Sequence, residues 1–324
     1  MNTPKILRTI ATAALMVAVA VGCASKSEAE DTTLRVLYWN FQNGMWSDEP
    51  NGYNNFAAWV RRYDPDVCIW CEAQTIYKPY TNEACAPEER YLVANWDKLA
   101  AKYGHTYWAI GGHRDNYPQV ITSKLPIEVV SQIVGEEPDS VVTHGAGHFR
   151  VEFNGKKVNI VTLHTWPQKY AYRAKDKEAS AAENGGDKYR LKEMEYICKN
   201  TIEKVADADK EYWLMAGDYN SRSRVDNHFY KWAEDDTRFL VHDYIRENTP
   251  YIDIIAERFP GEFHTTIAGK SRIDFIYCTA PLYERIVDAY VVNDAYTKDP
   301  VRDEKTNFHF PSDHLPILVD YEMK

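Results

Sequence analysis

A carboxylate and a carboxamide stand two positions apart at the end of an apolar stretch in this 324-residue chain. Residues 213–217 have strand character and stop at Gly217, which directs Asp218 and Asn220 to the same side of the chain. A carboxylate that takes a proton from water, beside an amide that orients the water or binds a metal, suits hydrolysis of a phosphate ester. Gly, Asp and Asn also form turns, so the motif alone supports a surface turn equally well.

Polar side chains of the same kind stand at the ends of other predicted strands or just before them. They are Asn40, Glu72, His164, Asp274, Asp313 and His314. Each has an ordinary structural explanation, such as a buried acid satisfied in the core, or an ion pair between Asp274 and Arg272. One shared site explains the whole set better than six unrelated ones.

The elements that must position these residues are short strands alternating with a few helices. Apolar and β-branched runs predict strands at 34–40, 67–70, 106–110, 120–123, 127–133, 150–153, 157–165, 240–243, 272–278, 286–292 and 317–321. Apolar spacing and stop signals predict helices at 56–63, 88–103, 188–205 and 227–235. Asn154-Gly155 predicts a tight hairpin, and residues 166–187 predict a long surface loop.

The amino terminus has the pattern of an export signal. Two basic residues precede the apolar run 10–21, which is too short to span a bilayer permanently, and small residues precede Cys23. We expect a cleaved signal peptide at 1–22, a flexible tether at 23–33 and one domain at 34–324. The context of Cys23 resembles a bacterial lipobox, which predicts lipidation of Cys23 and anchoring to a membrane outside the cytoplasm; simple secretion is the alternative.

The chain carries more acidic than basic residues. The net formal charge is −10, and without residues 1–22, which carry two basic residues and no acids, 36 basic stand against 48 acidic residues, or −12. This balance disfavours broad attachment to a nucleic-acid backbone, which needs Lys and Arg against the phosphates. The predicted loop near His164 contains a local set of cations, Lys169, Arg173, Lys175 and Lys177, partly cancelled by neighbouring acids.

Five cysteines remain when Cys23 is set aside, so they cannot all pair. Cys68 and Cys71 have Cys-x-x-Cys spacing, but they lie in an apolar strand rather than at a helix start, which favours buried strand thiols. Given export, Cys71 with Cys85 is a candidate disulfide.

Seven ordered motifs resemble the endonuclease/exonuclease/phosphatase superfamily, which includes deoxyribonuclease I-like nucleases, apurinic endonucleases, neutral sphingomyelinases and inositol polyphosphate 5-phosphatases. The resemblance runs from about residue 34 to residue 321. The motifs are Trp39-Asn40, residues 64–67 leading to Glu72, residues 123–127, residues 162–164, residues 217–220, residues 272–276 and residues 312–316. Gly217-Asp218-Tyr219-Asn220 and Ser312-Asp313-His314 are the most specific.

The resemblance implies an α/β fold, a four-layer α/β/β/α sandwich of two mixed sheets flanked by helices, with a Mg²⁺ or Mn²⁺ site at one edge. It assigns the metal to Asn40 and Glu72, with Asp313 as an additional candidate ligand. It makes Asp218 the base that activates water and Asn220 the residue that positions the water or the phosphate. It makes His164 and His314 donors to the phosphoryl oxygens, with Asp274 orienting His314. Hard oxygen ligands agree with a magnesium site.

The chain departs from the family pattern at two places. Trp70-Cys71 precedes Glu72 where relatives more often have an apolar residue and Gln, and Tyr117-Pro118-Gln119 stands where many have an Asn-Gly pair. The second departure lies near the phosphate site of relatives, so we assign no catalytic role to Tyr117 or Asn116.

Three functions are therefore in competition. The leading one is a metal-dependent phosphoesterase for a small or lipid-borne ester, and the second is a nuclease acting on DNA or RNA. The third is a catalytically silent member that binds carbohydrate or phospholipid, for which the 23 tyrosines and 9 tryptophans, including Trp46 and Trp166, supply aromatic surface. Loss of a motif residue would favour the third function, and every motif residue is present. The oligomeric state does not follow from the sequence.

Overall fold

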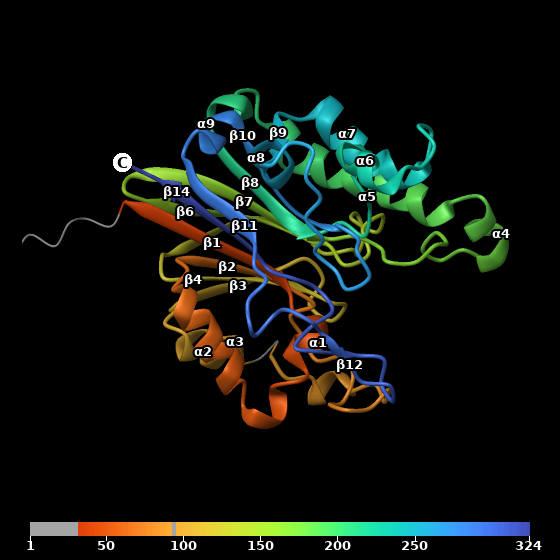
Figure 1. Cartoon of the computed structure of the whole chain (residues 1–324), viewed down its shortest axis with the longest axis horizontal. Helices are drawn as coiled ribbons and strands as arrows, with labels where there is room; N and C mark the ends of the chain where they lie inside the picture. The colour runs from red at the N-terminus through yellow and green to blue at the C-terminus, as the bar shows by residue number, and fades with distance from the viewer. Residues whose placement is uncertain (1–31, 93–94) are drawn as a thin grey trace, which may run out of the picture. The chain divides into compact units, whose positions relative to one another are not determined.

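Alternating side chains build two six-stranded sheets, which pack face to face with helices outside them (Figure 1). The structure, a computed structural model, describes residues 32–92 and 95–324. The predicted signal peptide at 1–22, Cys23 and most of the predicted tether lie outside the described residues. Residues 32–324 form one compact unit.

The first sheet has the strand order β11-β14-β1-β2-β4-β3. Within it, β1 and β2 run parallel, and the other neighbours run antiparallel. Its strands are β1 (Thr33–Asn40), β2 (Val67–Cys71), β3 (Tyr107–Gly111), β4 (Gln119–Ser123), β11 (Ile286–Val291) and β14 (Ile317–Glu322).

The second sheet has the order β5-β6-β7-β8-β10-β9, with β7 and β8 parallel. Asn154 and Gly155 both adopt positive φ between β6 and β7, which confirms the predicted hairpin. Its strands are β5 (Ile127–Ile133), β6 (Ala146–Phe153), β7 (Lys156–His164), β8 (Tyr212–Asp218), β9 (Tyr251–Asp253) and β10 (Asp274–Thr279). A separate ribbon pairs β12 (Val301–Arg302) with β13 (His309–Phe310).

Three apolar clusters hold the layers together. The central cluster combines the inner faces of both sheets, for example Val36 and Ile69 with Ile160 and Leu214. A second, aromatic cluster lies between the first sheet and the helices α2 and α3. A third lies between the second sheet and the helices α5 and α7. The predicted four-layer sandwich of two mixed sheets is confirmed.

Most helices of the described residues are short. The α-helices are α1 (Gln42–Met45), α2 (Asn54–Tyr63), α3 (Trp96–Lys102), α4 (Lys177–Ala182), α5 (Gly185–Asn200), α6 (Asn227–Tyr230), α7 (Leu240–Asn248), α8 (Ile254–Arg258) and α9 (Ala280–Tyr283). The 3₁₀ turns are Glu49–Asn51, Pro87–Glu89, Ile202–Lys204, Ala208–Lys210, Arg224–Asp226 and Thr237–Phe239. No helix of the described chain is long and apolar enough to cross a membrane.

Two element predictions are wrong, and the helix predicted at 227–235 ends at Tyr230 because Lys231 takes a left-handed conformation. Residues 240–243 belong to the helix α7 instead of a strand, because Val241 and Ile245, four positions apart, are buried together against α5. The predicted helix at 88–103 is divided: a 3₁₀ turn ends at Glu89, Tyr91 N donates to Thr75 Oγ1, and α3 begins only at Trp96. A short run without flanking context does not distinguish helix from strand.

The predicted loop at 166–187 contains a helix and the start of another. Asp176 caps α4 by accepting a hydrogen bond from Ala179 N at 2.9 Å. Gly186 lies in the first turn of α5, and a Cβ there would lie 2.1 Å from the Gln168 carbonyl oxygen. The glycine permits close packing of α5 on the preceding segment.

The candidate disulfide between Cys71 and Cys85 is absent, because all five cysteines of the described residues are free thiols. Cys71 is buried in β2, where its thiol contacts the Leu163 carbonyl oxygen at 3.3 Å across the central core. Cys68 lies in the same strand and is also buried, in agreement with structural strand thiols.

Candidate active site

The sheet register brings all the polar strand ends to one edge of the sandwich. The parallel strands β1 and β2 end there with Asn40 and Cys71, and Glu72 follows. The parallel strands β7 and β8 end there with His164 paired to Asp218. Antiparallel β10 begins there, opposite Asp218. Because β14 is antiparallel to β1, the segment just before β14 delivers Asp313 and His314 to the same edge.

Asp218 lies at the centre of this group. Its Oδ2 accepts a hydrogen bond from Asn40 Nδ2 at 3.0 Å and lies 3.7 Å from His164 Nε2 and 3.9 Å from His314 Nε2. Burial and then the Asp274 carboxylate raise the pKa of Asp218 to about 7, against the charge of His314. A carboxyl group with such a pKa can exchange a proton near neutral pH.

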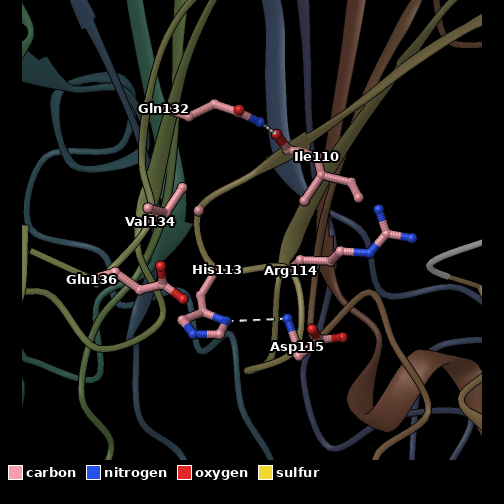
Figure 2. Close-up of a pocket in the computed structure, with 8 residues that line it drawn as sticks. Ile110, His113, Arg114, Asp115, Gln132, Val134 and Glu136 are labelled. Atoms are coloured by element: carbon pink, nitrogen blue, oxygen red, sulfur yellow. Dashed lines mark hydrogen bonds between the residues drawn. The ribbon is translucent and has the colours of Figure 1, made fainter. Parts of the chain in front are cut away.

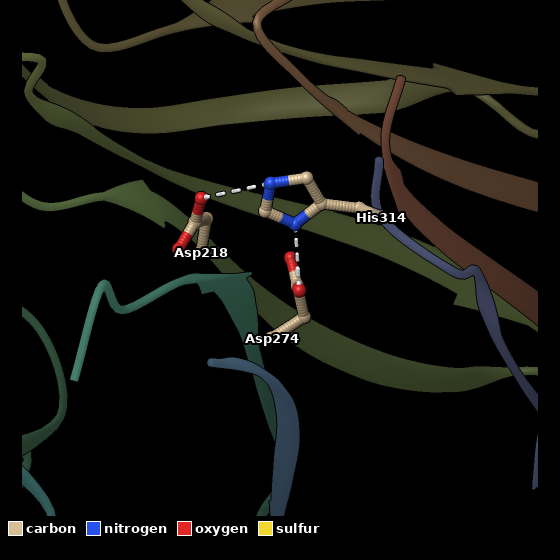
Figure 3. Close-up of side chains that lie close together, drawn as sticks. All are labelled: Asp218, Asp274 and His314. Carbon is tan, nitrogen blue, oxygen red and sulfur yellow. Dashed lines mark hydrogen bonds and ion pairs between the residues drawn. The ribbon is translucent and has the colours of Figure 1, made fainter. Parts of the chain in front are cut away.

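His314 and Asp274 form a buried dyad (Figure 3). His314 Nδ1 lies 2.8 Å from Asp274 Oδ2, and Tyr38 Oη donates to Asp274 Oδ1 at 2.7 Å. Burial opposes protonation of His314, but Asp274 and Asp313 outweigh it and raise the pKa well above its ordinary value. The arrangement leaves His314 Nε2 toward Asp218, as an acid beside the candidate base.

The pairing of Asp274 with His314 answers one alternative raised by the sequence. Arg272, two positions earlier, bonds instead to Asp226 at 2.8 Å and to Asp253 at 2.7 Å. Arg272 is therefore neutralised by Asp226 and Asp253, and Asp274 is left to pair with His314.

Glu72, Asn40 and Asp313 form an oxygen-rich corner beside Asp218. Asn40 Nδ2 lies 3.5 Å from Glu72 Oε1, and Asn43 N donates to Glu72 Oε2 at 2.9 Å. Asp313 Oδ1 is buried and has no hydrogen-bond partner in the described chain. Burial and the charge of Asp313 raise the pKa of Glu72. A divalent cation would relieve this repulsion and satisfy the orphan oxygen, so these residues fit a hard metal ion.

A second set of donors overlaps this corner. Ligand atoms of Asp218, Asp274 and His314 lie within 4.8 Å of one another, which also suits a metal ion. Asp274 Oδ2 and His314 Nδ1 already satisfy each other at 2.8 Å, however, and the sequence does not suggest Asp274 as a ligand. This hydrogen bond favours a proton-holding pair over two metal ligands.

His164 faces Asp218 from the end of β7, inside a stack of aromatic rings. The rings of His144 and His164 stack with centroids 4.5 Å apart, and Tyr117 meets His164 edge-on at 6.4 Å. Burial and the neighbouring His144 hold the pKa of His164 well below its usual range. His164 is therefore a neutral imidazole that donates one N–H.

Asn220 occupies the turn after Asp218. Its backbone has φ 46°, a left-handed conformation that Asn tolerates, and its N–H donates to Asp218 Oδ1 at 2.9 Å. Its side-chain Nδ2 donates to the Thr165 carbonyl at 3.1 Å. The turn couples the base to the end of β7.

Several residues at this edge were missed by sequence reasoning. Tyr38, His144, Glu193 and Arg222 carry no motif signal except that Arg222 follows Asn220 by two positions. Glu193 of α5 is buried and accepts hydrogen bonds from Thr143 N at 2.8 Å and from Trp166 N at 2.7 Å. It therefore connects the segments that carry His144 and His164.

Residues 117–119, where the chain departs from the family pattern, pack beside Glu72 and His164. The Pro118 carbonyl accepts from Ala73 N at 2.9 Å, which holds the segment beside Glu72. Tyr117 has φ 49° and lines the aromatic stack beside His164.

A cavity of about 340 Å³ is lined by the strands β3 and β5 and by the loops that follow them. Figure 2 shows His113 turned toward Glu136, with Arg114 pointing to the other side. None of the candidate catalytic or metal-binding residues lines this cavity, so it is distinct from the candidate active site.

Comparisons with known proteins agree with this geometry. The profile of the Endonuclease/Exonuclease/phosphatase family matches residues 37–314. No curated protein sequence matches the chain.

Similar solved structures include an AP endonuclease from Archaeoglobus fulgidus, with 18% identity, a TM-score of 0.57, and coverage of 89% of this chain and 99% of that one. A Bacteroides thetaiotaomicron endonuclease/exonuclease/phosphatase family protein has 16% identity, a TM-score of 0.53, and coverage of 90% and 98%. A humanized D. rerio TDP2 has 13% identity, a TM-score of 0.51, and coverage of 90% and 99%. These likenesses concern the fold, and with the profile match over most of its length the chain belongs to the endonuclease/exonuclease/phosphatase family.

Proposed function

We propose that this chain is a divalent-metal-dependent hydrolase of phosphate esters, with a small or lipid-borne ester as its substrate. Members of the family are phosphoester hydrolases and are usually metal-dependent. The observation that carries the proposal is the position of Asp218, whose carboxylate contacts Asn40, His164 and His314 at one buried edge.

Asp218 is the general base in this proposal. Its carboxylate takes a proton from water while the water oxygen forms a bond to phosphorus and the bond from phosphorus to the leaving oxygen breaks. The leaving oxygen keeps the bonding electrons and takes up a proton from solvent. Asn40 and the Asn220 N–H hold the two carboxylate oxygens, so the base is already oriented.

The two histidines stabilise the charge that builds on the phosphoryl oxygens. Neutral His164 donates an N–H, and protonated His314 donates from Nε2 because Asp274 occupies its Nδ1. Tyr38 donates to the second oxygen of Asp274, which fixes the orientation of the carboxylate that holds His314.

Asn40, Glu72 and Asp313 would hold the divalent cation, Mg²⁺ or Mn²⁺. When bound, the cation supplies positive charge that polarises the phosphoryl oxygens. The orphan Asp313 Oδ1 and the raised pKa of Glu72 support this ligand set.

A nuclease activity is the alternative substrate assignment. The AP endonuclease and TDP2 structures share the fold, but their sequence identities are below 20%. The acidic charge of the chain supports the small-ester assignment, because a nuclease that tracks a long backbone needs several phosphate contacts. A silent binding module is disfavoured by the complete set of site residues.

We also propose that the protein is exported and anchored through a lipidated Cys23, on the sequence pattern of residues 1–23. Fractionation of cells expressing the full chain and Cys23→Ser tests this proposal. The anchored chain should sediment with membranes and Cys23→Ser should not; identical fractionation of both would overturn it.

The function is tested with a substrate panel. Bis-p-nitrophenyl phosphate, p-nitrophenyl phosphate, inositol phosphates, sphingomyelin and plasmid DNA are incubated with the purified protein in Mg²⁺, Mn²⁺ or EDTA. We expect turnover of at least one small or lipid ester that EDTA abolishes. No turnover of any ester by the native chain, with Asp218→Asn indistinguishable from it, would reject the hydrolase.

A further inference from the structure

Arg222 occupies an unusual position beside the catalytic carboxylate. It follows Asn220 by two residues and is half-buried. Two nitrogen donors of its guanidinium are weakly bonded or unbonded. Nη2 lies 3.4 Å from Ser271 Oγ, and Nε is buried with no hydrogen-bond partner in the described chain. Unused buried donors of a cation are costly.

The arginines around Arg222 differ from it because they form ion pairs. Each has an acidic partner: Arg190 bonds Asp187, Arg224 bonds Asp243, Arg238 bonds Asp236, and Arg272 bonds Asp226 and Asp253. Arg222 has no carboxylate within ion-pair distance among the described residues. The local acids are already engaged, so nothing nearby is available to neutralise it.

The turn before Arg222 contacts the reaction centre, because Asn220 N donates to Asp218 Oδ1 at 2.9 Å. Burial lowers its pKa, and the charges of Arg190 and Arg238 lower it further, whereas Tyr230 and Asp218 raise it. The charge of Asp218 thus acts on Arg222, and the guanidinium extends toward Ser271 Oγ at 3.4 Å.

The chemistry of this place suits an anion. A guanidinium binds phosphate oxygens through two parallel hydrogen bonds, and the hydroxyl group of Ser271 lies beside it. The scissile phosphate belongs with Asp218, His164 and His314, so an anion at Arg222 is a different group of the same substrate.

We propose that Arg222 is a specificity-determining residue that binds a second phosphate of the substrate, next to the phosphate that is hydrolysed. The inference rests on the proposed phosphoesterase function and names its substrate class: an ester that carries an additional phosphate group.

The test uses two esters that differ only in that group: the p-nitrophenyl ester of thymidine 5′-phosphate, with and without a 3′-phosphate. The native chain should prefer the ester with the 3′-phosphate through a lower KM. In Arg222→Gln this preference should fall about 10- to 100-fold, the usual value of hydrogen bonds to a charged group. Arg222→Lys should keep part of it, because a point charge remains without the planar fork.

Arg285→Gln is the matched control. Arg285 precedes β11 at the opposite end of the sheet from Asn40, and its side chain makes no hydrogen bond or ion pair in the described chain. Its variant should show the native preference. Thermal unfolding of all variants separates a binding role from a structural one, because a structural role would lower the melting temperature and affect both esters equally.

A second measurement avoids turnover. Binding of thymidine 3′,5′-bisphosphate and thymidine 5′-phosphate to Asp218→Asn is compared by calorimetry, with and without Arg222→Gln. A bisphosphate preference that depends on Arg222 supports the inference. Equal affinities, or a preference unchanged by Arg222→Gln, overturn it even if the native chain hydrolyses esters. Conversely, absence of hydrolysis by the native chain rejects the proposed function without altering this binding result.

Discussion

Asp274 and His314, forty positions apart in the chain, form a buried hydrogen bond of 2.8 Å between Oδ2 and Nδ1. The contact orients the imidazole so that its other nitrogen lies 3.9 Å from Asp218. The same acid accepts from Tyr38 on the opposite sheet. The hydrogen bonds from Tyr38 to Asp274 and between Asp274 and His314 therefore join both sheets and hold His314 beside the candidate base.

We expect Asp274→Asn to lower the pKa of His314, because a neutral amide no longer stabilises the imidazolium. NMR titration of the histidine C2 protons measures this pKa. Activity should fall on the order of 10- to 100-fold, as for other residues that orient a functional imidazole. An unchanged His314 titration would remove Asp274 from this role. Asp288→Asn is the control, because Asp288 lies on β11 and forms a half-exposed ion pair with Arg258.

Asp218→Asn should reduce turnover by about 10²- to 10⁴-fold, because the amide keeps the shape of the side chain but accepts no proton from water. The melting temperature should stay within a few degrees of the native value. Single-turnover kinetics on the best ester of the panel gives the rate. Turnover close to native in this variant contradicts the assignment of Asp218 as the base.

Glu72→Gln should weaken metal binding, since a neutral ligand replaces a charged one at a divalent cation. We expect activity to recover in part as the concentration of Mg²⁺ or Mn²⁺ is raised, and titration of Mn²⁺ followed by electron paramagnetic resonance should show a higher Kd. Glu152→Gln, on the exposed face of β6, serves as the control. An unaltered metal dependence would exclude Glu72 from the ligand set.

The free energy of unfolding should vary with pH because Glu193 titrates. Burial raises the pKa of this carboxyl to about 7, against the hydrogen bonds from Thr143 and Trp166. Between about pH 4.5 and 7, the folded state therefore holds a proton on Glu193 that the unfolded state has lost. Glu193 contributes stability below about pH 4.5, and this contribution declines as the pH rises toward 7.

Urea unfolding of the native chain and Glu193→Gln between pH 4.5 and 8 measures this effect. The amide variant should show a weaker decline over that range, because position 193 no longer titrates. Parallel curves for the two proteins would show that Glu193 keeps an ordinary pKa in the fold.

Cleavage of plasmid DNA and of small esters across a salt series distinguishes the two substrate classes. Each neutralised phosphate steepens the fall of log affinity against log salt by about 0.9, so a chain that contacts one or two phosphates should show a shallow slope. Efficient plasmid cutting with a steep slope would instead assign the chain to the nucleases.

The sequence alone determined the polar strand ends, because a buried strand reveals its end by the first polar residue after an apolar run. Asn40, Glu72, His164, Asp218 and Asp274 were found in this way, and the order of their motifs predicted the four-layer sandwich. These signals are local, so they survive without knowledge of the fold. Local signals failed at residues 240–243, where packing on α5 selects a helix.

Only the tertiary structure decided which of these side chains contact one another and which remain without a partner of opposite charge. Asp274 could pair with Arg272 on sequence grounds, but Asp226 and Asp253 bind Arg272, and the segment before β14 brings His314 to Asp274 instead. Arg222 became distinctive only when every neighbouring arginine was seen with an acid. Asp274 lies 40 positions from His314 and 236 positions from Tyr38. No local pattern encodes such contacts, because their energy arises only when the two sheets close on each other.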